Sequence, residues 1–109
     1  MLVIDRKTGK TIGKVIEMCD EYKRVKREDG TIGLIYPEDE MWLFNVVPEC
    51  KVISMTNDML FHGTFNDCRQ FCRDRWTLGK YGAEFLVRDC CTWVINLNSY
   101  VAQITCEAM

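Results

Sequence analysis

Thiols and one imidazole are the most reactive side chains in this sequence, which has seven cysteines and a single histidine. Cys68 and Cys72 are four residues apart, the spacing of one helical face, and His62 lies just upstream. Cys90 and Cys91 follow, and thiolates and imidazole are ligands that suit zinc. No Cys-x-x-Cys pair occurs, however, and adjacent cysteines on a strand point to opposite faces. We therefore expect neither a metal site nor a cofactor.

Covalent catalysis would require an activated cysteine, and His62 is the only histidine that could serve as its base. The sequence contains no glycine-framed nucleophile elbow, no Gly-rich phosphate loop and no distinct pair of carboxylates. We expect a protein that is not an enzyme.

Four cations around Val25 form a first candidate binding surface, the basic cluster: Lys23, Arg24, Lys26 and Arg27. Because side chains alternate along a strand, two of them face each side of the sheet. Acidic residues flank the cluster on both sides and cancel much of its field within a Debye length of about 8–10 Å. A water-exposed hairpin that resists edge pairing is the first interpretation, and contact with nucleic-acid phosphates is the alternative.

Three acids form a second candidate surface, the acidic turn of Glu38, Asp39 and Glu40, which is followed directly by Met41 and Trp42. The acids would steer a basic partner towards this surface, and the aromatic ring would anchor it. The alternative is a solvated turn that leads into a core segment. We expect the partner-binding residues to lie in the acidic turn with its two apolar neighbours, or in the basic cluster.

Strands carry most of these residues. An N-terminal β-meander is predicted over residues 11–18, 21–27 and 31–36, with an Asp-Gly hairpin turn between the last two strands. Residues 41–47 are apolar and predict a buried strand or a short helix, which Pro48 ends. Further strands are expected at residues 51–55, 59–62, 83–89, 92–97 and 100–106.

One principal helix is expected at about residues 65–77. Thr64 can cap its first turn, where amide groups lack partners within the helix. Four residues recur at helical spacing and predict the stripe that packs on the sheet: Phe65, Cys68, Cys72 and Trp76. The predicted fold class is therefore α+β, with mostly antiparallel sheet.

Length and composition favour a single domain over residues 1–109. With 16 acids and 14 bases the net charge is −2, which is too balanced to indicate nucleic acid or a membrane as partner. No apolar run approaches the ~20 residues that span a bilayer, and no secretory signal is present. The odd number of cysteines then indicates free thiols and a cytoplasmic protein.

The segment from Leu60 to Arg88 resembles a β-turn-α-β unit found in small uncharacterised proteins of bacteriophages and mobile elements. The resemblance rests on Gly63-Thr64-Phe65, on Cys68 and on the strand, helix and return strand around them. It brings no catalytic or binding residue with it. It implies a setting in which compact proteins bind and block a host machine, as inhibitors of CRISPR nucleases do.

Two functions follow as expectations. The first is a non-enzymatic protein-binding module, such as a phage-encoded inhibitor of the anti-CRISPR type that blocks a host defence protein in the bacterial cytoplasm. The second is a small β-rich nucleic-acid-binding module that uses the hairpin of residues 22–36. Neither function involves a membrane, and the sequence does not specify an oligomeric state.

Overall fold

The computed structural model describes residues 1–88 and 91–107, and contacts among its residues group the chain into two compact units. Unit 1 is Met1–Val47, and unit 2 begins at Pro48. Each has its own sheet and its own buried cluster. A single domain over residues 1–109 stays a prediction, because compact units of this size can also unfold together.

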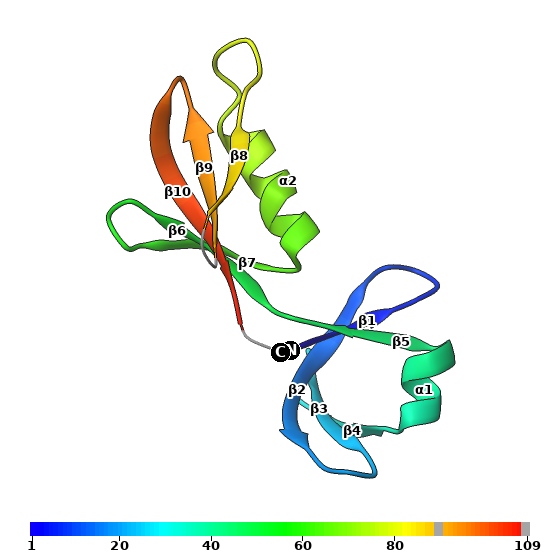
Figure 1. Cartoon of the computed structure of the whole chain (residues 1–109). Coiled ribbons are helices and arrows are strands. Elements are labelled where there is room, and N and C mark those ends of the chain that lie inside the picture. The colour runs from blue at the N-terminus through cyan, green and yellow to red at the C-terminus, as the bar shows by residue number, and fades with distance from the viewer. Residues whose placement is uncertain (89–90, 108–109) are drawn as a thin grey trace. The chain divides into compact units, whose positions relative to one another are not determined.

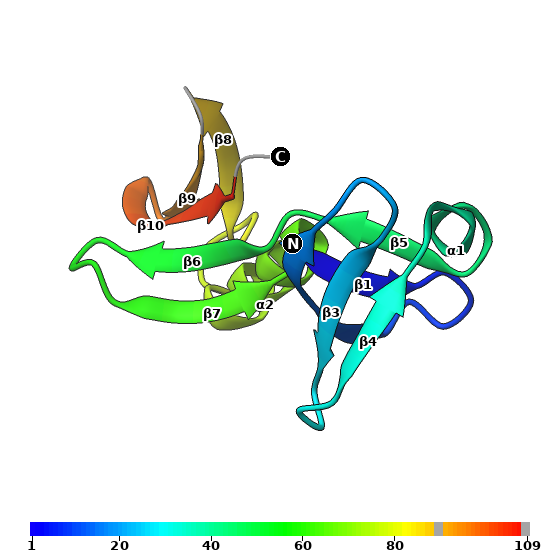
Figure 2. The ribbon, with the colours of Figure 1, turned by 90° about the horizontal axis from the view of Figure 1, so that it is seen from below.

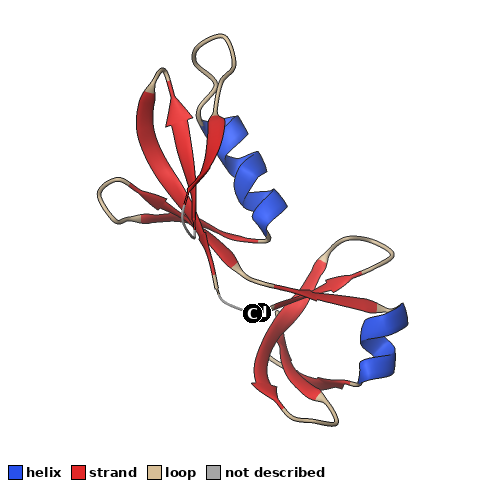
Figure 3. Cartoon of the chain, in the orientation of Figure 1, coloured by secondary structure: helices blue, strands red, loops and turns tan. Residues whose placement is uncertain are grey.

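Unit 1 is an antiparallel sheet of five strands in the order β4-β3-β2-β1-β5, with a one-turn helix before the last strand (Figures 1 and 3). The predicted meander and its hairpin are confirmed, and Gly30 in the turn has the positive φ of 88° that glycine adopts without strain. The elements are β1 (Leu2–Asp5), β2 (Thr11–Met18), β3 (Lys23–Arg27), β4 (Ile32–Ile35), α1 (Pro37–Trp42) and β5 (Phe44–Val47).

The core of unit 1 lies on one face of this sheet. Val3, Val25 and Ile35 are buried there, and Phe44 and Val46 pack against them. Val25 pairs directly with Val15 on β2, so the centre of the β2–β3 ladder is apolar. This burial fixes the register of β3, because a shift of one residue would turn Arg24 and Lys26 towards the core in place of Val25.

Unit 2 is a second five-stranded antiparallel sheet, in the order β7-β6-β10-β9-β8, with a helix that packs on β6, β7 and β10 (Figures 1 and 2). The strands predicted in this half are confirmed, except that position 89 lies outside the described residues. The elements are β6 (Cys50–Ser54), β7 (Met59–Gly63), α2 (Phe65–Arg75), β8 (Glu84–Arg88), β9 (Cys91–Asn96) and β10 (Ser99–Cys106).

Helix α2 confirms the predicted cap and most of the predicted stripe. The hydroxyl of Thr64 accepts a hydrogen bond of 3.1 Å from the backbone N–H of Asp67. Cys68 and Cys72 are fully buried, and Trp76 is half-buried against the same core. The prediction that Phe65 belongs to the buried stripe is wrong. The residue is 36% exposed, and the Arg69 guanidinium lies over its ring.

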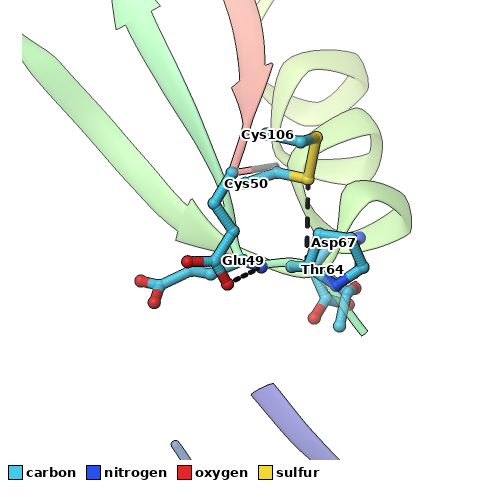
Figure 4. Close-up of a disulfide and its surroundings, with 7 residues drawn as sticks. Glu49, Cys50, Thr64, Asp67 and Cys106 are labelled. Atoms are coloured by element: carbon cyan, nitrogen blue, oxygen red, sulfur yellow. Dashed lines mark hydrogen bonds between the residues drawn. A yellow bond between two sulfur atoms is a disulfide. The ribbon is translucent and has the colours of Figure 1, made fainter. Parts of the chain in front are cut away.

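A disulfide between Cys50 and Cys106 overturns the expectation that all cysteines are free thiols (Figure 4). The two residues are 56 positions apart, so their spacing gave no sign of pairing. They lie directly opposite each other on neighbouring strands β6 and β10, and this juxtaposition brings the sulfurs together. Among the described residues the free cysteines are Cys19, Cys68, Cys72 and Cys91, and Cys90 lies outside the described part.

The chain is thus mainly antiparallel strand with two short helices, α1 of 6 residues and α2 of 11. An α+β class fits only roughly. The helix predicted at about residues 65–77 is present as α2, but its standing as the principal helix is not clear, because the segment expected to be a turn forms α1. Over residues 1–88 and 91–107, neither helix has the length and apolar character needed to cross a membrane.

Candidate functional site

The acidic turn forms the body of helix α1, because other residues of unit 1 bond the backbone groups at both ends of that helix. Pro37 occupies its first turn, where a missing N–H costs nothing. The Asp39 carboxylate accepts a hydrogen bond of 3.0 Å from the backbone N–H of Tyr36. At the other end the Arg6 guanidinium donates to the carbonyl oxygens of Glu40 (2.6 Å) and Phe44 (3.0 Å). These contacts set the direction in which the chain leaves α1.

Helix α1 ends in three consecutive exposed apolar residues, which we call the α1 ridge: Met41, Trp42 and Leu43. Their exposed fractions are 66%, 74% and 55%. Of the predicted buried strand or short helix over residues 41–47, the helix forms only at Met41 and Trp42. Burial is wrong for the first three residues and for Asn45, whereas Phe44 and Val46 pack on the core of unit 1. Isolated exposed apolar residues are ordinary, but three in succession that include a tryptophan make this end of α1 a candidate surface.

An open pocket of about 330 Å³ adjoins the ridge. Trp42, Leu43 and Phe44 provide its apolar wall, and Asp5 and Lys7 from the end of β1 and the following turn provide its polar edge. Sequence analysis did not single out Leu43, Asp5 or Lys7. The pairing of Asp5 with Phe44 across β1 and β5 brings these segments together, and no local sequence pattern reports that pairing.

The three acids of the acidic turn have different surroundings. Asp39 serves as the helix cap, and Glu40 forms an ion pair of 2.7 Å with the Lys23 ammonium. Glu38 is exposed, and no hydrogen bond or ion pair is found for it within the described part of the chain. Of these three carboxylates, only that of Glu38 is therefore available to pair with a cation of a partner.

Three of the four cations of the basic cluster also have side-chain partners within unit 1. Lys23 pairs with Glu40, and Arg24 pairs with Glu17 at 3.0 Å. The Arg27 guanidinium donates to the Thr31 hydroxyl at 3.3 Å. The register places Lys23 with the buried Val25 and Ile35 on one face, and Arg24 and Lys26 on the other, as alternation predicts. These contacts leave Lys26 as the exposed cation most accessible to phosphate.

The cysteine and histidine side chains of unit 2 do not assemble into a reactive centre. Burial raises the pKa of the Cys68 thiol to about 12 and that of Cys72 to about 11, so both stay protonated near neutrality. His62 lies on β7 with Nδ1 3.1 Å from the Glu49 carboxylate. Over residues 1–88 and 91–107, no group of three or more His, Cys, Asp and Glu side chains is placed to hold a metal ion.

Over its described residues the chain is thus a small protein with two antiparallel sheets. Its short acidic helix α1 ends in an apolar ridge next to an open pocket. Comparisons with protein-family models, with curated proteins and with solved structures found no match to this chain.

Proposed function

We propose that this chain is a non-enzymatic protein-binding module whose α1 ridge inserts into an apolar surface of its partner. The observation that carries the proposal is the exposure of Trp42 between Met41 and Leu43. Tryptophan is among the residues that contribute most to interfaces, and its large ring can fill an apolar pocket of a partner. The adjoining pocket could receive one apolar side chain of the partner.

The charges around the ridge support a partner with a basic rim. Glu38 is exposed on α1, three residues before Met41, whereas Arg6 and Lys23 are held by groups of unit 1. The exposed cation Lys7 lies at the edge of the pocket, so the basic part of the partner's rim would face Glu38 and not the pocket. A lysine or arginine of the partner that approached Glu38 would speed association, and the ridge would then set the rate of dissociation.

A phage-type inhibitor that blocks a host defence protein, such as a CRISPR nuclease, is the biological role we propose for this module. It depends on the resemblance of residues 60–88 to units of phage and mobile-element proteins. In the bacterial cytoplasm that this role implies, the cell's reductants would keep Cys50 and Cys106 as thiols. Those residues belong to unit 2, so the ridge in unit 1 does not depend on their bond.

The test compares proteins captured from bacterial lysate by the natural chain and by two variants. Trp42→Ser removes the centre of the ridge. Tyr81→Ser is the matched control, because Tyr81 is an aromatic residue of unit 2 with a similar exposed fraction of 71%. We expect a partner that the natural chain and the Tyr81 variant retain, and that the Trp42 variant loses.

Rate measurements with the purified partner then distinguish the effect of Glu38 on association from the effect of Trp42 on dissociation. Glu38→Lys should slow association at low salt with little change in dissociation, and Trp42→Ser should mainly speed dissociation. A partner that binds all of these variants equally would exclude the α1 ridge as the interface. Binding to nucleic acid that weakens steeply with salt and with Lys26→Glu would instead favour the nucleic-acid-binding alternative.

A further inference from the structure

Strand β8 is an edge strand whose outer side pairs with no other strand of the described chain. Its inner side is bonded to β9 in a continuous register from Glu84↔Ile95 to Arg88↔Cys91, without a bulge. Val87 is 76% exposed and its neighbour Leu86 is also exposed. Natural proteins usually protect such edges with prolines, bulges or lysines, because unpaired backbone groups invite another strand.

Two of the other three sheet edges carry such protection, and the third, β4, has only four residues. Strand β7 has a register shift opposite Val52 and Ile53. Strand β5 is followed directly by Pro48. Strand β8 has none of these devices, and the sequence of its five residues is the reason to ask what would pair with it.

That sequence, Glu84-Phe85-Leu86-Val87-Arg88, is complementary to itself when read in the opposite direction. In an antiparallel pair centred on Leu86, each Glu84 lies opposite the Arg88 of a second copy, and each Phe85 lies opposite a Val87. Residues directly opposite in an antiparallel ladder share a face, and pairs of opposite charge or of apolar side chains stabilise it. A different register would lose both ion pairs.

The faces of the sheet agree with this pairing. Phe85 lies opposite the buried Val94, so Phe85 and Val87 are on the side that carries α2. Leu86 lies opposite Trp93 on the other side, together with Glu84 and Arg88. A twofold axis normal to the sheet keeps each side chain on its own side, so the added strands continue one sheet through two copies of unit 2.

We propose that β8 is a homodimerisation edge, at which two copies of this chain join antiparallel through Glu84–Arg88 ion pairs and a central Leu86 contact. The interface is small, because stable dimers bury about 1,200–2,000 Å² and one strand pair buries less. The dimer is accordingly weak and depends on concentration. It is independent of the proposed binding role of unit 1, although a dimer would present two α1 ridges and so gain avidity from a paired partner.

The test uses charge reversals in the full-length chain, measured by sedimentation from micromolar to millimolar protein. Glu84→Arg alone and Arg88→Glu alone each place like charges opposite each other twice. We expect each variant to dissociate with a Kd at least about tenfold higher than the natural chain, because such contacts cost several kcal/mol. A non-reducing gel excludes intermolecular disulfides as the source of any dimer.

Mixing the two single variants provides the rescue that only this register predicts. A Glu84→Arg copy and an Arg88→Glu copy have complementary edges, so an equimolar mixture should form a heterodimer more tightly than either variant self-associates. The double variant E84R/R88E should self-associate like the natural chain. A monomer at every concentration would overturn the proposal, and so would a dimer that is insensitive to the single reversals or is not restored in the mixture.

Discussion

The ammonium of Lys23 and the carboxylate of Glu40 meet at 2.7 Å and link strand β3 to helix α1. Lys23 belongs to the basic cluster and Glu40 to the acidic turn, which the sequence presents as alternative binding surfaces. In unit 1 they are one connected structure. Reversing either charge therefore disturbs both surfaces, and Glu38 and Lys26 are the cleaner probes of binding.

The Lys23–Glu40 pair should contribute modestly to stability. Its side chains are about a quarter exposed, at 24% and 26%, so solvent screens the attraction only partly. A double-mutant cycle with Lys23→Ala and Glu40→Ala, measured by urea unfolding, should give a coupling of about 0.3–1 kcal/mol. Arg24 and Glu17, which are more exposed, are the matched control and should give a smaller coupling.

Gly13 should be much less tolerant of substitution than Gly33. A Cβ atom at Gly13 would collide with the backbone carbonyl oxygen of Lys26 on β3, and one at Gly33 would meet only the movable guanidinium of Arg27. We expect Gly13→Ala to destabilise unit 1 by about 1–3 kcal/mol, as other overpacked sites do. Gly33→Ala should cost clearly less. Equal losses in thermal unfolding would mean that β2 and β3 are not in this register.

Trp76 and Trp42 should differ sharply in their contribution to folding. Trp76 is half-buried against the core of unit 2, so Trp76→Ala should cost about 1–3 kcal/mol, less than the ~3–5 kcal/mol of a fully buried aromatic. Trp42→Ala removes an exposed side chain and should change stability by no more than about 0.5 kcal/mol. A large loss at Trp42 would show that the α1 ridge is part of a core.

Local chemistry made much of the fold predictable. The Asp-Gly turn near residue 30 and the Thr64 cap depend on residues adjacent in sequence, and both are present as predicted. Helix α1 was predicted only in part, as the short-helix alternative for residues 41–47, and Arg6, which bonds its last turn, is more than thirty residues away. Phe65 has helical spacing, but periodicity cannot show that a nearby arginine would cover its ring.

The candidate site was predictable only in part. The acids and Trp42 attracted attention by type and spacing. The bond of Asp39 to the Tyr36 N–H is a local capping contact, but the Glu40 partner, Lys23, lies 17 positions away and no local pattern indicates it. The pocket beside Trp42 depends on the β1–β5 pairing, and the Cys50–Cys106 bond depends on the β6–β10 pairing. Such pairings join residues far apart in the chain, so a single sequence carries little information about them.

Unit 2 should lose stability in alkali through its buried thiols. Burial raises the pKa of Cys68 to about 12 and of Cys72 to about 11, whereas the ordinary value is 9.0. The unfolded chain therefore binds fewer protons above pH 9, and the free energy of unfolding falls from there towards pH 11–12. Urea unfolding across this range should show the fall. The double variant C68A/C72A should flatten it, and an unchanged slope would contradict the assignment.

The Cys50–Cys106 bond should stabilise unit 2 when it is formed. In oxidised protein, peptide mapping without reduction should find these two cysteines linked. Closing a loop of 56 positions lowers the conformational entropy of the unfolded chain, which raises the free energy of unfolding by about 4 kcal/mol. Mild reduction should therefore lower the unfolding temperature. Cys19→Ser is the control, because Cys19 is an exposed thiol of unit 1 and should not change the response to reductant. A linkage between other cysteines would refute the β6–β10 register.

When it is formed, the Cys50–Cys106 bond closes the chain between these residues into a covalent ring that contains every element from β6 to β10. A protease that cuts once inside the ring, for example near the exposed Tyr81, cannot release a fragment from the oxidised protein. The nicked chain would keep its full mass until a reductant opened the ring. Cleavage before β6 would break the backbone link to unit 1 in either redox state, so the redox state matters only for cuts inside the ring.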